Sequence, residues 1–465
     1  MTVPGWVQDS IFYQIFPDRF ENGDPTNDPI NVQPWGSKPT VWGFQGGDLR
    51  GVLNRFDYLI DLGVNAIYLN PIFQATANHR YNTMDYYKID PRLGDITDFK
   101  ELCERAHRQN IRVILDGVFN HCGRSFFAFA DVLENREYSP YRDWFHIQHF
   151  PVDAFSPGDA KDYLAWWSIK SLPKFNTSNP DVRRYLFGVA RYWLEQGADG
   201  WRLDVPNEID DDEFWAEFRH AVRSVNPEAY LLGEIWKPDP RWVGDDHFDG
   251  LMNYTLRECI LNLVDPGGRD STHCISKLDS ISHLYPPQNT RAMYNLLGSH
   301  DTERALYMCG EDNQRLKLAY ILLFAYPGIP AIYYGDEIGL SGGKDPECRA
   351  AFPWDEKKWD HSLRSHVKAL IAARKSLPAL RRGDYRHIHS DHRRHCFAFA
   401  RQLSNQSVLV VINASPVRRH VCVPVIEMGW PDERIVRDVL GKGEYRINGQ
   451  TVLIDLPPLS GLWLT

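Results

Sequence analysis

The sequence predicts an α/β fold: a (β/α)8 TIM barrel with an inserted subdomain after the third strand and a C-terminal antiparallel β-sandwich domain. Eight short apolar runs recur over the first 335 residues, helix-length amphipathic stretches precede most of them, and β-branched runs replace this rhythm after Ala379. Continuous apolar strands that alternate with helices are typical of a covered parallel sheet, and eight such units favour a closed barrel. An open doubly wound sheet is the alternative, although no Gly-x-Gly-x-x-Gly motif follows the first run.

The predicted barrel strands are 11–16, 66–70, 112–116, 200–204, 230–234, 250–254, 292–297 and 331–335. Helical patterns over 51–63 and 98–109 precede the second and third strands. Asp116 and Asp204 end consecutive strands but are 88 residues apart, whereas one βα unit takes about 30 residues. The third unit therefore carries an insertion of about 50 residues by the same rule.

The segment 126–175 within this insertion holds 13 aromatic residues, which suits either a subdomain over the barrel mouth or a surface loop with its own core. After Ala379, the runs 396–400, 407–412, 420–423 and 451–454 are β-branched and bounded by turn residues, which predicts antiparallel strands. We expect a catalytic barrel over 1–120 and 177–378, an inserted subdomain B over 121–176 and a β-domain over 379–465.

Composition narrows the class of protein. Among 465 residues, 43% are hydrophobic and 24% charged, which is ordinary for a globular protein. The net charge of −9 disfavours nucleic-acid binding, and no apolar run approaches the roughly 18 residues of a membrane span. Eight cysteines without a Cys-x-x-Cys pair, and a start without a secretory signal, predict reduced thiols and a cytoplasmic location. The 15 tryptophans favour a ligand with flat apolar faces, such as a sugar ring.

Acidic residues end several predicted strands. Asp116, Asp204 and Glu234 end three strands in succession, and His300-Asp301 follows the seventh. The C-terminal strand ends of such a barrel converge on its active site. Any one of these acids could instead cap a turn or join a structural ion pair. A ring of acids at one mouth is costly in repulsion and desolvation, so together they indicate a functional site.

Two of these acids have contrasting surroundings. Arg202 and Asp204 are two residues apart on one strand and point the same way, so Arg202 would keep Asp204 ionised, as a nucleophile requires. Glu234 has apolar neighbours that include Trp236, which predicts the raised pKa of a general acid. One carboxylate of each kind is the requirement of glycoside hydrolysis.

Four segments resemble the motifs of the α-amylase family of glycoside hydrolases, in the family's order: Asp-Gly-Val-Phe-Asn-His at 116–121, Gly-Trp-Arg-Leu-Asp at 200–204, Gly-Glu-Ile-Trp at 233–236 and Ser-His-Asp at 299–301. Leu-Pro-Lys-Phe-Asn at 172–176 and Val-Pro-Asn-Glu at 205–208 are similar to motifs of its neopullulanase and cyclomaltodextrinase subfamily, where Ala is usual at Pro206. Two departures are Glu303, where Pro is usual, and a first strand near residue 11 with no preceding β-domain. The second resembles the short debranching-type members and leaves the oligomeric state open.

The resemblance implies roles for matching residues. Asp204 would be the nucleophile, Glu234 the acid and then the base, and Asp301 the residue that holds two sugar hydroxyls. The implied sugar contacts are His79, Tyr81, His121, Arg202, His300, Asp345, Arg349, Glu208 and Trp236. A surface ion pair is the alternative for Asp345 with Arg349, and a buried structural histidine is the alternative for His121 and His300.

A metal site is also expected. The segments 22–28 and 46–48 are rich in the short oxygen-bearing residues that calcium binds, although a solvated turn has the same composition. The subfamily resemblance places a structural calcium ion at these positions. The predicted ligands are Asn22, Asp24, Asn27, Asp28, Gly46 and Asp48. No organic cofactor is expected.

The sequence therefore predicts a retaining hydrolase of maltooligosaccharides, cyclodextrins or pullulan-type branched glucans, with α-1,4 bonds, α-1,6 bonds or both as targets. The alternatives are a transglycosylase acting on the same substrates and a non-catalytic sugar-binding relative. A nucleotide-sugar-binding α/β protein is disfavoured because no phosphate-binding glycine loop is present.

Overall fold

A computed structural model describes residues 3–267 and 271–465 and confirms the barrel. Its parallel strands lie in the order β8-β7-β6-β5-β2-β1-β10-β9, and a parallel bridge between Met252 and Tyr294 links the two end strands. The strands are β1 (Phe12–Ile15), β2 (Ala66–Leu69), β5 (Arg112–Gly117), β6 (Gly200–Leu203), β7 (Tyr230–Gly233), β8 (Gly250–Leu251), β9 (Tyr294–Asn295) and β10 (Ile329–Tyr333). Each overlaps one of the predicted runs.

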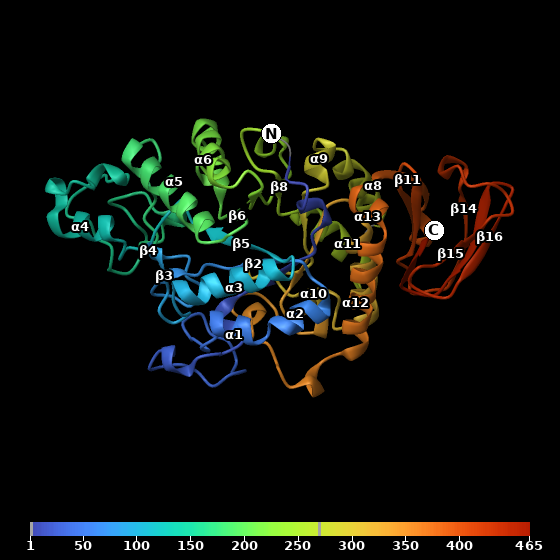
Figure 1. The fold of residues 1–465 in the computed structure, drawn as a ribbon, viewed down its shortest axis with the longest axis horizontal. Helices are drawn as coiled ribbons and strands as arrows, with labels where there is room; N and C mark the ends of the chain where they lie inside the picture. The colour runs from blue at the N-terminus through green and yellow to red at the C-terminus, as the bar shows by residue number, and fades with distance from the viewer. Residues whose placement is uncertain (1–2, 268–270) are drawn as a thin grey trace.

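Helices form the outer layer of the barrel (Figure 1). They are α1 (Leu49–Asn54), α2 (Phe56–Leu62), α3 (Ile96–Arg108), α5 (Pro180–Glu195), α6 (Asp212–Val225), α7 (Tyr254–Val264), α8 (Ser271–Ser282), α9 (Pro287–Thr290), α10 (Ala305–Met308), α11 (Asn313–Ala325), α12 (His361–Ser376) and α13 (Pro378–Arg382). Helix α3 illustrates why they form: Asp95 and Asp98 make a capping box at its start, and Phe99, Cys103 and Ala106 repeat on its buried face.

Large side chains fill the interior of the barrel. Phe12, Tyr68, Ile114, Tyr230 and Tyr294 are all buried in one cluster, with the rings of Phe12 and Tyr294 5.5 Å apart. The barrel is therefore a packed core and not a pore, so its interior leaves no room for a ligand, and the active sites of such barrels lie at the C-terminal strand ends.

The insertion between β5 and α5 contains α4 (Phe127–Asn135), at the far left of Figure 1. Its aromatic residues pack against one another, with the rings of Phe129 and Phe145 4.9 Å apart, and their cluster is continuous with the core between the barrel and its helices. Isolated bridges join His121 to Lys174 and Phe145 to Phe175, so the two ends of the insertion return to the barrel together. A separate antiparallel hairpin, β3 (Phe73–Ala75) and β4 (Thr83–Ile89), follows β2.

The C-terminal region, at the right of Figure 1, contains two four-stranded antiparallel sheets. The inner sheet comprises β11 (Asp384–Asp391), β12 (Cys396–Leu403), β13 (Gln406–Asn413) and β18 (Ser460–Leu464), and the outer sheet β14 (Arg419–Pro424), β15 (Ile435–Arg437), β16 (Glu444–Asn448) and β17 (Thr451–Leu456). On β12, Phe397 and Phe399 pack in the barrel core, whereas Ala398 and Ala400 pack between the two sheets. Both faces of the inner sheet are covered, which explains its unbroken apolar run.

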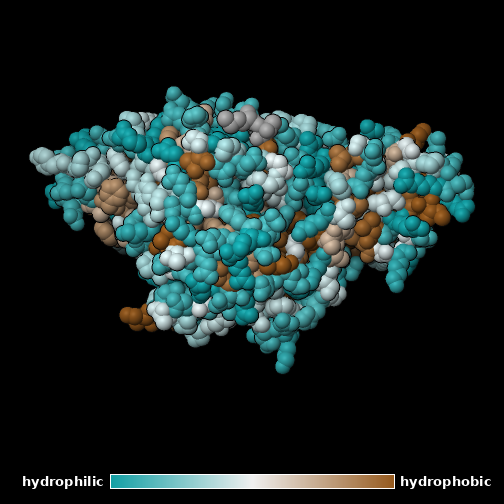
Figure 2. All heavy atoms as spheres, viewed as in Figure 1, coloured by the Kyte–Doolittle hydropathy of each residue, from teal (hydrophilic) through white to brown (hydrophobic). Residues whose placement is uncertain are grey.

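The surface in Figure 2 is mainly hydrophilic, with scattered apolar side chains. Among the described residues, no helix combines the length and apolar character needed to cross a membrane. None of the eight cysteines, all of which lie in the described part of the chain, forms a disulfide, and seven of them are buried.

Candidate active site

Three strand ends bring their acidic residues to one guanidinium group. Arg202 Nη1 lies 2.8 Å from Asp116 Oδ1 and 2.9 Å from Asp204 Oδ1, and its Nη2 lies 3.0 Å from Glu234 Oε1. Asp116 belongs to β5, Arg202 to β6, and Glu234 directly follows β7. The carboxyl groups of Asp204 and Glu234 therefore share one cation at the C-terminal mouth of the barrel, as the motif spacing predicts.

Asp301 joins this group through a second cation. His300 Nε2 lies 3.0 Å from Asp301 Oδ2, and Arg349 Nη2 lies 3.4 Å from Asp301 Oδ1. Arg349 Nη1 also lies 3.4 Å from Asp345 Oδ2, so Asp345 and Arg349 connect to the acid cluster and are not an isolated surface pair. Burial opposes the ionisation of Asp301, but His300, Arg349 and Arg202 together lower its pKa below the ordinary range.

Burial sets the pKa values of the other two acids. It raises the pKa of Glu234 to about 7, against the opposing effect of Arg202, which is the shift predicted for a general acid. Burial also raises the pKa of Asp204. Repulsion from Glu234 and Asp116 raises it further, whereas Arg202 lowers it. The expectation that Arg202 would hold the pKa of Asp204 low is therefore wrong, because the effect of burial outweighs that of Arg202. The two acids titrate as a pair.

His79 and Tyr81 lie on the loop between β3 and β4. The Tyr81 hydroxyl donates to Asp116 Oδ2 at 2.7 Å and lies 2.5 Å from His300 Nε2. The rings of Tyr81 and His300 are nearly parallel, 5.4 Å apart, and His79 stacks on Tyr81 at 5.9 Å. This arrangement places a phenol and two imidazoles beside the acids, where they can contact a sugar ring.

Burial favours the neutral form of two imidazoles of the site. Burial lowers the pKa of both His79 and His121 to about 3. Nε2 of His121 is buried and has no hydrogen-bond partner among the described residues. A buried polar atom without a partner is unfavourable, so a ligand hydroxyl is a fitting partner for it.

Glu208 and Trp236 follow β6 and β7, the strands that precede Asp204 and Glu234. Trp236 Nε1 donates to Glu234 Oε1 at 3.2 Å, and its ring stacks on Tyr254 at 3.8 Å while 48% of the side chain stays exposed. Lys174 Nζ donates to the Glu208 carbonyl oxygen at 2.6 Å and lies 3.7 Å from its Oε2. The segments 172–176 and 205–208, which resemble subfamily motifs, are therefore in contact.

Some residues at the site were not predicted from the sequence. Asn70 Nδ2 donates to the Tyr81 hydroxyl at 3.0 Å, and Gln14 Nε2 contacts Asn70 Oδ1 at 3.0 Å and His300 Nδ1 at 2.9 Å. Each is a polar residue within or directly after an apolar strand, a signal that could have found them. The ring of Trp166 covers that of His121 at 5.5 Å, a contact that no local pattern indicates.

Some of the predicted calcium ligands are free to bind an ion, and others already accept hydrogen bonds. Oδ1 of Asn22 and Oδ1 of Asn27 are buried and have no hydrogen-bond partner within residues 3–267 and 271–465, which suits oxygens that bind a metal ion. Both oxygens of Asp28 accept hydrogen bonds from Asn22 at 2.9 Å. Asp48 instead accepts four N–H groups, from Gly23, Asp24, Asn27 and Gly51, and caps α1. The asparagine oxygens therefore suit an ion, whereas the carboxylate of Asp48 is already occupied.

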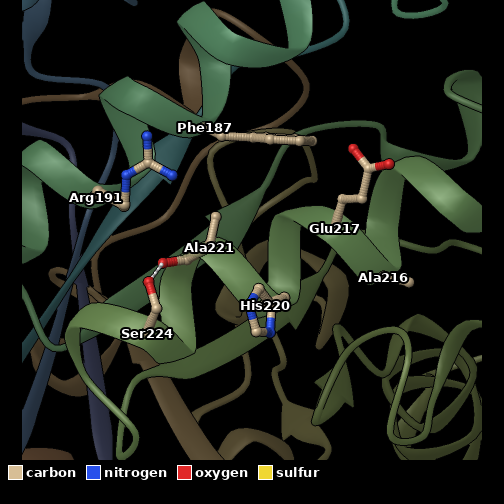
Figure 3. Close-up of a pocket in the computed structure, with 7 residues that line it drawn as sticks. All are labelled: Phe187, Arg191, Ala216, Glu217, His220, Ala221 and Ser224. Atoms are coloured by element: carbon tan, nitrogen blue, oxygen red, sulfur yellow. Dashed lines mark hydrogen bonds between the residues drawn. The ribbon is translucent and has the colours of Figure 1, made fainter. Parts of the chain in front are cut away.

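A separate groove of about 540 Å³ lies between α5 and α6 on the outer layer of the barrel (Figure 3). Its walls include Phe187, Arg191, Glu217 and His220. None of the clustered acids lines it, so it is distinct from the candidate active site.

Comparison with known proteins agrees with this geometry. Residues 14–402 match the family described as Alpha amylase, catalytic domain. A cyclomaltodextrinase of Geobacillus thermopakistaniensis is 44% identical over 458 residues, 98% of this chain and 76% of that protein. Neopullulanase 2 of Thermoactinomyces vulgaris is 44% identical over 446 residues, which are 95% of this chain and 76% of that protein. The solved structure of cyclic alpha-maltosyl-(1→6)-maltose hydrolase from Arthrobacter globiformis has a TM-score of 0.90 at 39% identity and covers 100% of both chains.

Proposed function

The chain belongs to the alpha-amylase family of glycoside hydrolases, and we propose that it is a retaining hydrolase of α-glucans that cleaves α-1,4 bonds, α-1,6 bonds or both. The contact of one buried guanidinium, Arg202, with both Asp204 and Glu234 carries this proposal. It holds two carboxyl groups close together at the strand ends, with Asp301 beside them. A non-catalytic sugar-binding protein has no need of this complete and costly acid set.

The residues divide the reaction between them. Of the proton-sharing pair, Glu234 carries the proton, and the ionised carboxylate of Asp204, whose Oδ1 contacts Arg202 Nη1 at 2.9 Å, attacks the anomeric carbon. The protonated carboxyl of Glu234 gives its proton to the leaving glycosidic oxygen, and a covalent glycosyl-enzyme forms at Asp204. Glu234 then takes a proton from water, which attacks the same carbon and releases Asp204. The ionised Asp301 accepts hydrogen bonds from sugar hydroxyls during both steps.

The substrate class follows from the surroundings of the acids and from the relatives. Aromatic rings at Tyr81 and Trp236 suit the apolar faces of glucose units on either side of the reacting bond. The relatives include proteins named for cyclomaltodextrins, for pullulan and for a cyclic maltosyl-(1→6)-maltose. We propose maltooligosaccharides, cyclodextrins and pullulan-type branched glucans as substrates, and the cytoplasm, where unpaired thiols stay reduced, as the location.

Product analysis tests the proposal. Panose, maltotriose, β-cyclodextrin and pullulan are incubated with the enzyme, and products are separated by chromatography while proton NMR follows the anomer first released. We expect glucose or maltose, released as the α-anomer. Release of the β-anomer, or no product from all four substrates, would contradict it. A high maltose concentration distinguishes transglycosylation, which yields products longer than the substrate.

A structural calcium ion is part of the proposal. Asn22 and Asn27 would hold it through their unpartnered side-chain oxygens, with Asp28 and Asp24 supplying negative charge and the Gly46 carbonyl completing the set. The ion would supply no chemistry to the reaction. It would fix the N-terminal loop, in which the carbonyl oxygens of Val41 and Gly43 accept hydrogen bonds from Asn78 Nδ2.

A further inference from the structure

Three rings form a continuous stack that leads from the active site to the surface. The ring of Trp166 lies 5.5 Å from that of His121 at an interplanar angle of 21°, and the ring of Trp167 lies 4.5 Å from that of Trp166 at 10°. His121 belongs to the motif that follows β5 at the barrel mouth. Trp166 therefore contacts both of the other rings, whereas 75% of the Trp167 side chain is exposed.

The backbone that presents Trp167 is unusual. Trp167 has φ 49° and Ser168 has φ 58°, so two consecutive non-glycine residues adopt the left-handed conformation. This conformation is disfavoured for residues with a side chain, and such residues are concentrated at functional sites. Because 75% of the Trp167 side chain is exposed, the strained turn gains little buried apolar area in return.

Backbone hydrogen bonds hold this turn in place. The N–H of Trp166 donates to the Leu172 carbonyl oxygen at 3.0 Å, and the N–H of Ala160 donates to that of Ser168 at 2.8 Å. The position of Trp167 is therefore set before any ligand arrives, which lowers the entropy cost of binding to it.

We propose that the open face of Trp167 binds a glucose unit of longer α-glucans, beyond the units that contact the acids. A pyranose ring presents C–H groups on its faces and packs on an indole, as other apolar groups do. This inference rests on the proposed function and specifies it, because it makes Trp167 a determinant of preferred chain length.

The test compares Trp167→Ala and Trp167→Phe with the wild type on maltotriose, maltotetraose, maltopentaose and maltohexaose. For Trp167→Ala, we expect the loss of kcat/KM on maltohexaose to be about five times the loss on maltotriose, or more. A factor of this size corresponds to the free energy of one aromatic contact. Trp167→Phe should retain most of the preference. Tyr138→Ala is the matched control, since Tyr138 lies in the same insertion and is 86% exposed; its kinetics should equal those of the wild type.

A fall that is equal at every chain length would mean that Trp167 serves the structure alone, and no fall would mean that it does not touch the glucan; either result overturns the inference. Calorimetric titration of maltohexaose into Glu234→Gln and into Glu234→Gln/Trp167→Ala provides a readout without turnover. Weaker binding by the double variant is expected, and equal binding contradicts the inference. If the wild type hydrolyses no glucan, the proposed function fails, and this binding comparison still decides the role of Trp167.

Discussion

The backbone N–H of Val205 donates a hydrogen bond of 2.9 Å to Oε2 of Glu234. Val205 directly follows Asp204 and has φ 37° and ψ 51°, a left-handed conformation that β-branched residues rarely adopt. The turn after the nucleophile therefore also contacts the acid. This hydrogen bond ties the position of Glu234 to the backbone that directly follows Asp204.

Replacing Val205 with glycine tests this relationship. Glycine adopts a positive φ without steric cost, so we expect the thermal midpoint to stay within a few degrees of the wild type. The hydrogen bond from the Val205 N–H lowers the pKa of Glu234. Loss of the fixed turn weakens this bond and so raises that pKa. The alkaline limb of kcat/KM should therefore move to higher pH, while kcat falls. Val205→Ala, which keeps a side chain at this position, is the control. An unchanged pH profile in the glycine variant would show that the contact has no effect on the acid.

Glu234→Gln should lower kcat by a factor on the order of 10² to 10⁴, because the amide cannot donate an acid's proton to the leaving oxygen. The side chain keeps its size, so maltooligosaccharide binding, measured by calorimetry, should be largely unchanged. Turnover close to that of the wild type would refute the assignment of the acid.

The pH dependence of the reaction follows from the pKa of Glu234. Burial raises it to about 7, and the reaction needs the protonated form at the outset. We therefore expect kcat/KM to fall as the pH rises through about 7, and initial rates between pH 5 and 9 measure this limb. A limb that lies near the ordinary glutamate pKa of about 4.3 would contradict a buried acid.

A second buried acid should make stability depend on pH. Glu337 accepts hydrogen bonds from Tyr13 at 2.8 Å and Tyr58 at 2.5 Å, and burial raises its pKa. The folded state thus favours the neutral form of Glu337. The resulting stabilisation of the fold is complete below the pKa that Glu337 has in the unfolded chain, and it is lost as the pH rises through its pKa in the folded protein. Glu337→Gln cannot ionise, so its thermal midpoint should fall less than that of the wild type between pH 5 and 8. Parallel curves for the two proteins would rule out this linkage.

Bound calcium should raise the thermal stability of the protein. Chelator treatment of metal-replete protein should lower its thermal midpoint, since an ion that binds only the folded state stabilises it. Asn27→Ala should reduce the difference between treated and untreated protein, whereas Asn405→Ala, in the distant β12–β13 turn, should not. Elemental analysis that finds no calcium in the metal-replete protein would end the proposal.

The barrel could be predicted from the sequence because each of its strands is recognisable from a short run of neighbouring residues. Apolar runs such as 66–70 and 112–116 have a length and composition that only buried strands suit, and they coincide with β2 and β5. The same locality placed Asp116, Asp204 and Glu234 at strand ends. The mixed polar strands β11, β15 and β16 were not predicted, because strands with one exposed face and charged residues resemble turns in composition.

Tertiary structure decided what these residues do to one another. The sequence shows Arg202 beside Asp204, but the raised pKa of Asp204 depends on burial and on Glu234, which reaches it from another strand. Likewise, only the folded chain stacks Trp166 on His121 and gives Asp48 its four N–H donors. Desolvation, ring stacking and hydrogen bonding depend on distances in space, and those distances are set when segments far apart in the chain pack together.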